Sequence, residues 1–139
     1  MSIQTICRSI KKYKNFLIVA HTNPEGDALG AELGFYYLVK KLGKQATIIS
    51  DDQLPYGYDF LPGLQYIKRL GKQSSRIKFD CLVVLDCADL KRTGGVYKLR
   101  QDQPVLNIDH HISNQNFGDL NWVNPQYSSC SEMIYNLYK

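Results

Sequence analysis

Runs of apolar residues that stop at polar residues predict the strands of this chain. Four such runs are NFLIVAH (15–21), KQATIIS (44–50), FDCLVVLDC (79–87) and QPVLNIDHH (103–111), and LNWVNP (120–125) predicts a short fifth strand. Continuous apolar runs of this length are typical of strands that are buried on both faces of a parallel sheet.

Helical spacing of apolar residues separates these strands. Apolar residues at i, i+3, i+4 and i+7 predict one helix over residues 31–44, which Gly43 is suited to end, and another over residues 128–139. Three isoleucines at near-helical spacing predict a short helix over residues 2–14, and residues 54–68 read as a connection with short helical pieces. Alternating strands and helices predict an α/β fold: an open, mostly parallel sheet of about five strands with helices on both faces.

Composition is that of a globular domain. The chain has 139 residues, of which 44% are hydrophobic and 22% charged, enough for one domain with a core. The longest apolar runs are far too short to cross a membrane, and no signal peptide is recognisable, so we expect a cytoplasmic protein without a membrane partner. The four cysteines lack C-x-x-C spacing, which fits small buried side chains in a reducing compartment.

The basic residues give the chain a mild positive charge. The net charge is +4, and Lys and Arg cluster at 8–14, 40–44 and 68–78. Phosphate-rich ligands would be attracted to such clusters, but each is short. We therefore interpret them as solvated surfaces rather than as a nucleic-acid groove.

Three of the predicted strands end in residues that bind metals. In a parallel sheet the carboxyl ends of the strands share one edge, and ligands bind there. All three histidines of the chain belong to this set. The first strand ends at His21, followed by Glu25 and Asp27, the third ends at Asp86, and the fourth ends at Asp109, His110 and His111.

The ligand types indicate which metal is expected. Imidazole and carboxylate without thiolate favour Mn, Fe, Co or Zn over a structural zinc site, and the carboxylate share favours Mn²⁺. The donors suffice for two ions, and two ions about 3.5–4 Å apart are a recurring arrangement for attack on phosphorus. Asp86, alone at its strand end, is the natural bridging ligand.

Each of these residues also has a purely structural interpretation. Asp27 could be the N-cap of the helix that follows it, Asp86 a solvated start of a loop, and the Asp-His-His triplet an unspecific polar strand end. Together these interpretations require three coincidences, so we favour a metal site.

The motifs, in this order, resemble the DHH phosphoesterase superfamily. NIDHH contains the triplet that names the family, and HTNPEGDALG resembles its first motif, His-x-x-Pro-Asp-x-Asp-Ala-x-Gly. VVLDCADLKRTG resembles the second motif, and NPQYSSCSEMIY resembles the serine-rich start of a helix that follows the triplet. Residues 34–63 look most like the branch of oligoribonucleases and 3′-phosphoadenosine 5′-phosphate phosphatases, the nanoRNase type.

The resemblance implies an activity and a role for each matching residue. It implies hydrolysis of short oligoribonucleotides, of 3′-phosphoadenosine 5′-phosphate or of both, by two-metal activation of water. In this arrangement His21, Glu25 and Asp86 hold one Mn²⁺, and Asp27, Asp86 and His110 hold the other. His111 faces the substrate phosphate, Asp109 orients an imidazole from behind, Arg92 assists phosphate binding or forms a surface salt bridge, and Asn23 lines the site.

Other functions stay open at this point. They are another DHH activity (cyclic dinucleotide phosphodiesterase, RecJ-like single-strand exonuclease or pyrophosphatase) and a catalytically inactive, truncated remnant. A homodimer is compatible with the sequence.

The chain departs from the family pattern in two places. Glu25 stands where the family usually has Asp, which moves the carboxylate by about one C–C bond, roughly 1.5 Å. The chain also stops inside the last predicted helix. We therefore expect residues 1–139 to be a DHH catalytic domain that is incomplete at its C-terminus and lacks the C-terminal substrate-binding domain, and to be inactive or weak alone.

Overall fold

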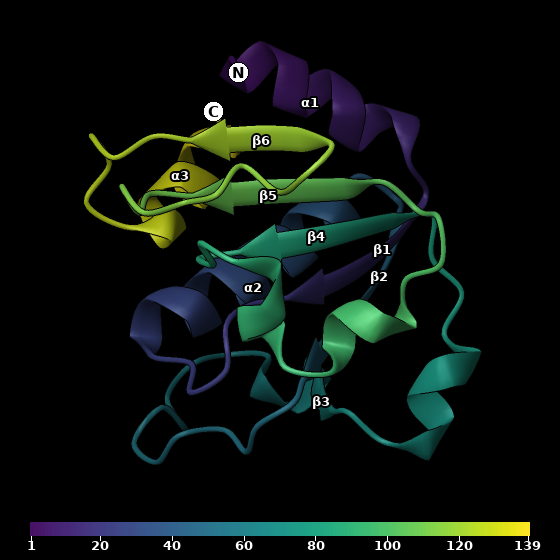
Figure 1. Ribbon diagram of the computed structural model, residues 1–139. Helices are drawn as coiled ribbons and strands as arrows, with labels where there is room; N and C mark the ends of the chain where they lie inside the picture. The colour runs from purple at the N-terminus through teal and green to yellow at the C-terminus, as the bar shows by residue number, and fades with distance from the viewer.

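The computed structural model describes residues 1–139, and a single sheet of six parallel strands forms its centre (Figure 1). The strand order is β3-β2-β1-β4-β5-β6, and every neighbouring pair is parallel. This confirms the predicted open parallel sheet, and it places all carboxyl strand ends at one edge. The strands are β1 (Asn15–Val19), β2 (Gln45–Ser50), β3 (Ile67–Arg69), β4 (Cys81–Leu85), β5 (Val105–Asp109) and β6 (Leu120–Val123).

Strand β3 corrects the expected strand count and lies in the segment that was predicted as a connection. Ile67 pairs with Ile48 and Arg69 with Ser50, so β3 extends the sheet beyond β2. Only Ile67 of the three residues is buried, and the other two are exposed and basic. An edge strand this short has no apolar run, which is why its sequence does not indicate a strand.

Helices cover both faces of the sheet, but the helices on the two faces differ in kind. The α-helices α1 (Ile3–Lys12), α2 (Gly26–Lys41) and α3 (Cys130–Leu137) contribute to one large core with the side chains of one sheet face. The 3-10 helices η2 (Lys72–Arg76), η3 (Leu90–Thr93) and η4 (Val96–Leu99) lie on the opposite face, over a smaller core. Figure 1 shows α2 and α3 behind the sheet and the short helices in front of it.

The central strands are buried on both faces, as the apolar runs predict. In β1, Ile18 belongs to the core under the α-helices, whereas Leu17 and Val19 belong to the core on the other side. This alternation follows from the two-residue period of a strand. No helix is long and apolar enough to span a membrane.

Helix α2 begins five residues earlier than the apolar spacing predicts. It starts at Gly26 and ends at Lys41, and Gly43 has a φ of 74°, the left-handed conformation predicted for the residue after the helix. Leu42, which completes the predicted apolar stripe, is exposed rather than buried. Because α2 starts at Gly26, Asp27 lies in its first turn, at the carboxyl edge of the sheet.

Candidate metal centre

A polar cavity of about 410 Å³ lies at the carboxyl edge of the sheet. None of the nine residues that line it is hydrophobic, in contrast to the apolar core beneath it. The cavity brings together residues from loops and helix starts that are far apart in the sequence. They are His21, Glu25, Asp27, Asp86, Arg92, His110, His111, Ser128 and Ser129.

His21 and Asp86 meet where the strand order reverses. Strands β1 and β4 are neighbours there, and in such sheets ligands bind in the crevice at this point. His21 Nε2 lies 3.5 Å from Asp86 Oδ2, while Nδ1 makes a 2.6 Å hydrogen bond with the carbonyl oxygen of Thr22. A carbonyl only accepts, so Nδ1 carries the proton and Nε2 faces Asp86. The hydrogen bond with Asp86 raises the pKa of His21, and desolvation opposes this.

Asp86 is buried, and one oxygen of its carboxylate has no hydrogen-bond partner. Its side chain is held by a backbone with a φ of 54°, uncommon for a residue other than glycine, and the residue is 5% exposed. Its Oδ1 is buried without a hydrogen-bond partner, although His110 Nε2 lies 3.4 Å away. An unpaired buried carboxylate oxygen is costly unless a cation or a donor reaches it. A divalent metal fits this position, because imidazole and carboxylate groups face it and no thiolate does.

Asp27 connects the cavity to the start of helix α3. Its Oδ2 lies 3.4 Å from His110 Nε2, on the cavity side. Its two carboxylate oxygens also accept hydrogen bonds from the backbone N–H groups of Cys130 (2.9 Å) and Ser131 (2.7 Å). The interpretation of Asp27 as the N-cap of its own helix is therefore wrong. Glu25 occupies that position, and Asp27 instead caps a helix more than 100 residues away.

Asp109 lies behind the cavity and holds His111. Asp109 is fully buried, and its Oδ1 accepts hydrogen bonds from the backbone N–H of His110 (2.8 Å) and from His111 Nδ1 (2.6 Å). Its Oδ2 accepts a hydrogen bond from Asn114 Nδ2 (2.7 Å). A carboxylate only accepts, so His111 carries its proton on Nδ1, and Nε2 is left for a ligand. Asp86, Asp109, His110 and His111 form a group whose possible metal ligands lie within 4.8 Å of one another.

Of three further residues that were predicted for the site, two line the cavity and one does not. Arg92 lines the cavity from η3, is exposed and forms no ion pair, so the predicted alternative of a surface salt bridge has no partner. Glu25 also lines the cavity, and its exposed side chain makes no capping hydrogen bond. Asn23 does not line the cavity. Its backbone N–H donates to Asp52 Oδ2 at 2.6 Å, and its side chain is exposed.

Two serines line the cavity that were not predicted as site residues. Ser129 is the N-cap of α3 and accepts a hydrogen bond from the backbone N–H of Glu132, as the capping-box spacing predicts. The Glu132 carboxylate reaches back to the N–H and hydroxyl of Ser128 rather than to Ser129. The serine-rich start of the predicted helix was the signal that could have indicated both residues.

Glu32 is a third residue that the sequence did not single out. It lies on α2, is 2% exposed, and its Oε2 has no hydrogen-bond partner. Burial, with a smaller effect from the charge of Asp86, raises the pKa of Glu32 to about 8, although a backbone hydrogen bond at Ala20 and the nearby His21 act to lower it. A carboxyl group among the apolar residues of a buried helix was the available signal.

The comparison with protein families identifies the chain. The family described as the DHH family, N-terminal domain, matches residues 15–139. The chain belongs to this family of phosphoesterases. The DHH triplet that names it is the one placed here at the end of β5.

Relatives within the DHH family carry more than one named activity. The chain is 35% identical over 124 residues to the bifunctional oligoribonuclease and PAP phosphatase NrnA of Thermus thermophilus, covering 86% of this chain and 35% of that protein. It is 22% identical to a probable manganese-dependent inorganic pyrophosphatase of Enterococcus faecalis, covering 88% of this chain and 40% of that protein. It thus spans less than half the length of these relatives.

A solved structure shares the fold. An exopolyphosphatase-related protein from Bacteroides fragilis superimposes with a TM-score of 0.88 at 25% identity, over 97% of this chain and 42% of that chain. The parallel sheet of this chain is therefore shared with that structure, and the cavity lies at the edge that such sheets use for ligands.

Proposed function

We propose that this chain carries the metal centre of a Mn²⁺-dependent phosphoesterase that hydrolyses short oligoribonucleotides, 3′-phosphoadenosine 5′-phosphate or both. The observation that carries the proposal is the polar cavity, which gathers three imidazoles and three carboxylates, one of which is Asp86 with its unpartnered Oδ1. The name of the Thermus thermophilus relative supports the substrate class, and that of the Enterococcus faecalis relative supports manganese.

The proposed division of metal ligands between two ions is the one that the resemblance to the DHH family implies, and each of these residues lines the cavity. His21, Glu25 and Asp86 would hold one ion, and Asp27, Asp86 and His110 the other. His21 is oriented for this role because its Nδ1 is hydrogen-bonded to the carbonyl oxygen of Thr22, which turns its Nε2 toward Asp86 in the cavity. Mn²⁺ bound in such a centre supplies polarisation of a phosphoryl oxygen and a lower pKa for water.

The remaining residues handle the phosphate. Arg92 has no partner of its own, so its guanidinium is available to pair with phosphate oxygens. His111 presents Nε2 to the substrate because Asp109 holds its Nδ1 proton. In the imidazolium form, with a second proton on Nε2, the ring can give that proton to a leaving oxygen and return to the neutral Nδ1–H tautomer. Asp109 itself is a positioning residue, since it is fully buried and contacts His111 rather than the cavity.

The proposal is tested by hydrolysis assays on the natural gene product that contains residues 1–139. We expect Mn²⁺-dependent cleavage of RNA di- to pentanucleotides or of 3′-phosphoadenosine 5′-phosphate, and a loss of about 100-fold or more in Asp86→Ala. Turnover that is unchanged in Asp86→Ala would contradict the mechanism. A panel that adds pyrophosphate, cyclic dinucleotides and long single-stranded DNA separates the activities of the family, and a preference for one of these would contradict the substrate class.

A further inference from the structure

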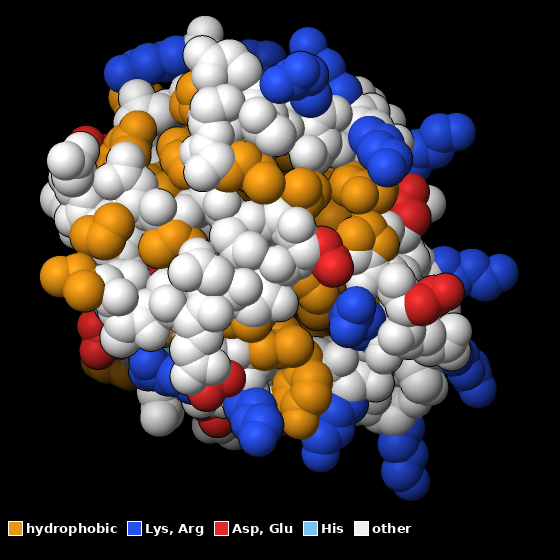
Figure 2. All heavy atoms as spheres, turned by 45° about the horizontal axis from the view of Figure 1, so that its top comes forward, with side chains coloured by type: hydrophobic (Ala, Val, Ile, Leu, Met, Phe, Trp, Pro, Cys, Tyr) orange, Lys and Arg blue, Asp and Glu red, His pale blue; other side chains and the backbone are white.

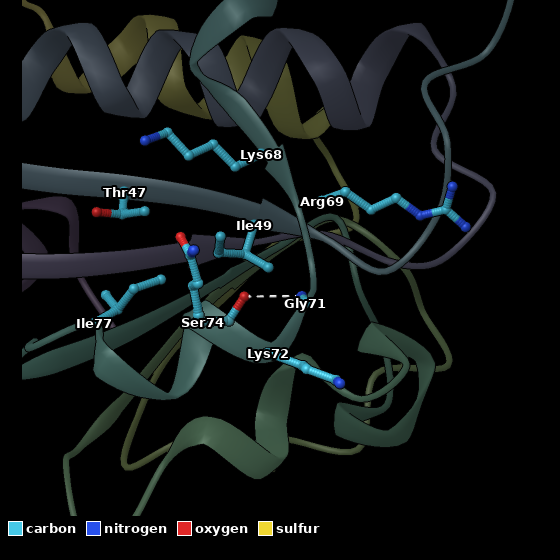
Figure 3. A pocket seen from close by; sticks show the side chains of 9 residues that line it. Thr47, Ile49, Lys68, Arg69, Gly71, Lys72, Ser74 and Ile77 are labelled. Atoms are coloured by element: carbon cyan, nitrogen blue, oxygen red, sulfur yellow. Dashed lines mark hydrogen bonds between the residues drawn. The ribbon is translucent and has the colours of Figure 1, made fainter.

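A second hollow lies on the face of the sheet opposite the α-helices, at its β3 edge (Figure 3). Its volume is about 440 Å³, and it is bounded by β2, β3 and η2. Three of its lining residues are basic, three are polar and uncharged, two are isoleucines and one is a glycine. None of them is acidic. The residues are Thr47, Ile49, Lys68, Arg69, Gly71, Lys72, Gln73, Ser74 and Ile77.

The basic side chains of this hollow spread along the strand direction. In Figure 3, Lys68 lies back along β2, whereas Arg69 and Lys72 extend past the arrowhead of β2, toward the carboxyl edge of the sheet. All three are exposed. Arg69 and Lys72 therefore extend from the hollow toward the edge of the sheet on which the metal cavity opens.

A neighbouring hollow of about 510 Å³ continues the surface on the other side of the same segment. Ile77 lines both hollows, so they meet at this residue. The second hollow adds Arg76 and Lys78 together with the amides of Gln101 and Gln103. We call the two hollows and the basic residues of segment 68–78 the basic groove.

The cations of the basic groove are not neutralised within the molecule. Lys68, Arg69, Lys72, Arg76 and Lys78 form no ion pair, and no acidic residue occurs between positions 60 and 79. On the lower right of the molecule, Figure 2 shows several projecting Lys and Arg side chains, with an acidic side chain above them. Five unpaired cations on so short a segment repel one another unless an anion binds.

The chemistry of the basic groove selects an extended anion with repeated charges. Its cations are distributed over two hollows, which suits a chain of phosphodiesters better than a single phosphate. Hydroxyl and amide groups between the cations, such as Thr47 and Gln73, provide further contacts to phosphate and sugar oxygens. No aromatic residue lines the first hollow, and Phe79 alone lines the second, so stacking on bases contributes little.

We propose that the basic groove binds the phosphodiester backbone of single-stranded RNA, at a site separate from the metal cavity and without reading its sequence. The choice of RNA over other polyanions rests on the proposed function, because the same chain would then hold the substrate that its metal cavity cleaves. The groove modifies the initial interpretation of segment 68–78 as a solvated surface: its charges surround hollows instead of an unbroken face.

Binding without turnover tests this inference. Fluorescence anisotropy would follow a 5′-labelled 12-nucleotide oligouridylate in EDTA, at several salt concentrations between 50 and 200 mM. The variant Lys68→Ala/Lys72→Ala/Lys78→Ala removes three charges from the groove, and the control Lys11→Ala/Lys12→Ala/Lys41→Ala removes three exposed charges from α1 and α2. Thermal unfolding of both variants verifies that the fold is kept.

We expect the groove variant to bind the RNA about tenfold or more weakly at 50 mM salt, and the control to bind as the unmodified chain does. The slope of log K against log salt should fall by about 2 in the groove variant, since each phosphate contact on a single strand contributes about 0.7. Equal losses in the two variants, or no binding by the unmodified chain, would overturn the proposal. Competition by inorganic polyphosphate that is as effective per charge as RNA would overturn the assignment to RNA. Because EDTA removes the metal, failure here is distinct from failure of the hydrolysis assay.

Discussion

Asp86 holds the least favourable position in the cavity when no cation is bound. It has a left-handed backbone, a buried carboxylate and one oxygen without a partner. Such features cost stability and concentrate at functional sites, where a ligand compensates for them. The stability of the chain should therefore depend on divalent metal through this residue.

Mn²⁺ should raise the melting temperature of the chain, and the rise should be lost in Asp86→Asn. Binding to the folded state alone adds about 2.7 kcal/mol when Mn²⁺ is present at 100 times its Kd. Thermal unfolding followed by circular dichroism, with Mn²⁺ and with EDTA, measures the difference. The exposed carboxylate variant Asp119→Asn is the matched control and should keep the full rise. A rise of equal size in Asp86→Asn would show that the metal binds elsewhere.

Glu32 predicts a pH dependence of stability with a defined sign. Burial raises the pKa of Glu32 from 4.5 to about 8, so between these values the folded state holds a proton that the unfolded state has released. The contribution of Glu32 is therefore fully present below pH 4.5 and is lost as the pH rises toward 8. In EDTA, the unfolding free energy of Glu32→Gln should rise relative to that of the unmodified chain as the pH is raised from 5 to 8. The expected relative gain over this range is about 1–3 kcal/mol.

Chemical denaturation at the two pH values measures this change. Glu25→Gln is the control, because Glu25 is exposed at the start of the same helix, and it should show no such gain. A difference between Glu32→Gln and the unmodified chain that does not vary with pH would contradict the buried neutral carboxyl group.

At the scale of elements, helix α3 packs closely on α2 at two glycines of α2. Gly30 and Gly34 face Ser131 and Ile134, and a Cβ at Gly30 would lie 2.7 Å from Ser131 Oγ. Ser131 Oγ also donates to the carbonyl oxygen of Asp27 at 2.9 Å. The same contact places Ser128 and Ser129 at the cavity, so the packing of α3 and the shape of the site are linked.

Gly30→Ala should lower the unfolding free energy by about 1–3 kcal/mol, because the added methyl group must push Ser131 or α3 away. Denaturant titration measures the loss. Gly71→Ala is the matched control, since a Cβ there meets nothing within 4 Å and its extended backbone suits alanine. A Gly30→Ala chain as stable as the control would show that α3 is not closely packed on α2.

At the scale of the whole molecule, the sequence was sufficient to predict the parallel sheet but not its edge strand β3. Apolar runs predict β1, β4 and β5 because both faces of these strands are buried, and the parallel rule then places His21 and Asp86 at one edge. Strand β3 was not predicted, because its pairing with β2, rather than its own composition, makes it a strand.

Contacts between distant residues explain what could not be predicted in the site. Asp27 caps α3 across more than 100 positions, and Asn114, which supports Asp109, also donates to the carbonyl oxygen of Cys87, 27 positions away. Neither contact leaves a periodic or spaced pattern in the sequence. The metal-binding residue types were visible, whereas the hydrogen bonds that orient them depend on the folded chain.

The central claim is that the strand-end residues form a metal centre around Asp86. The most direct measurement is an anomalous difference map at the manganese edge from crystals of the chain soaked in Mn²⁺. We predict a peak inside the cavity, within ligand distance of Asp86 Oδ1 and of His21 Nε2 or His110 Nε2. A map with Mn²⁺ bound at other sites and no peak in the cavity would contradict the account.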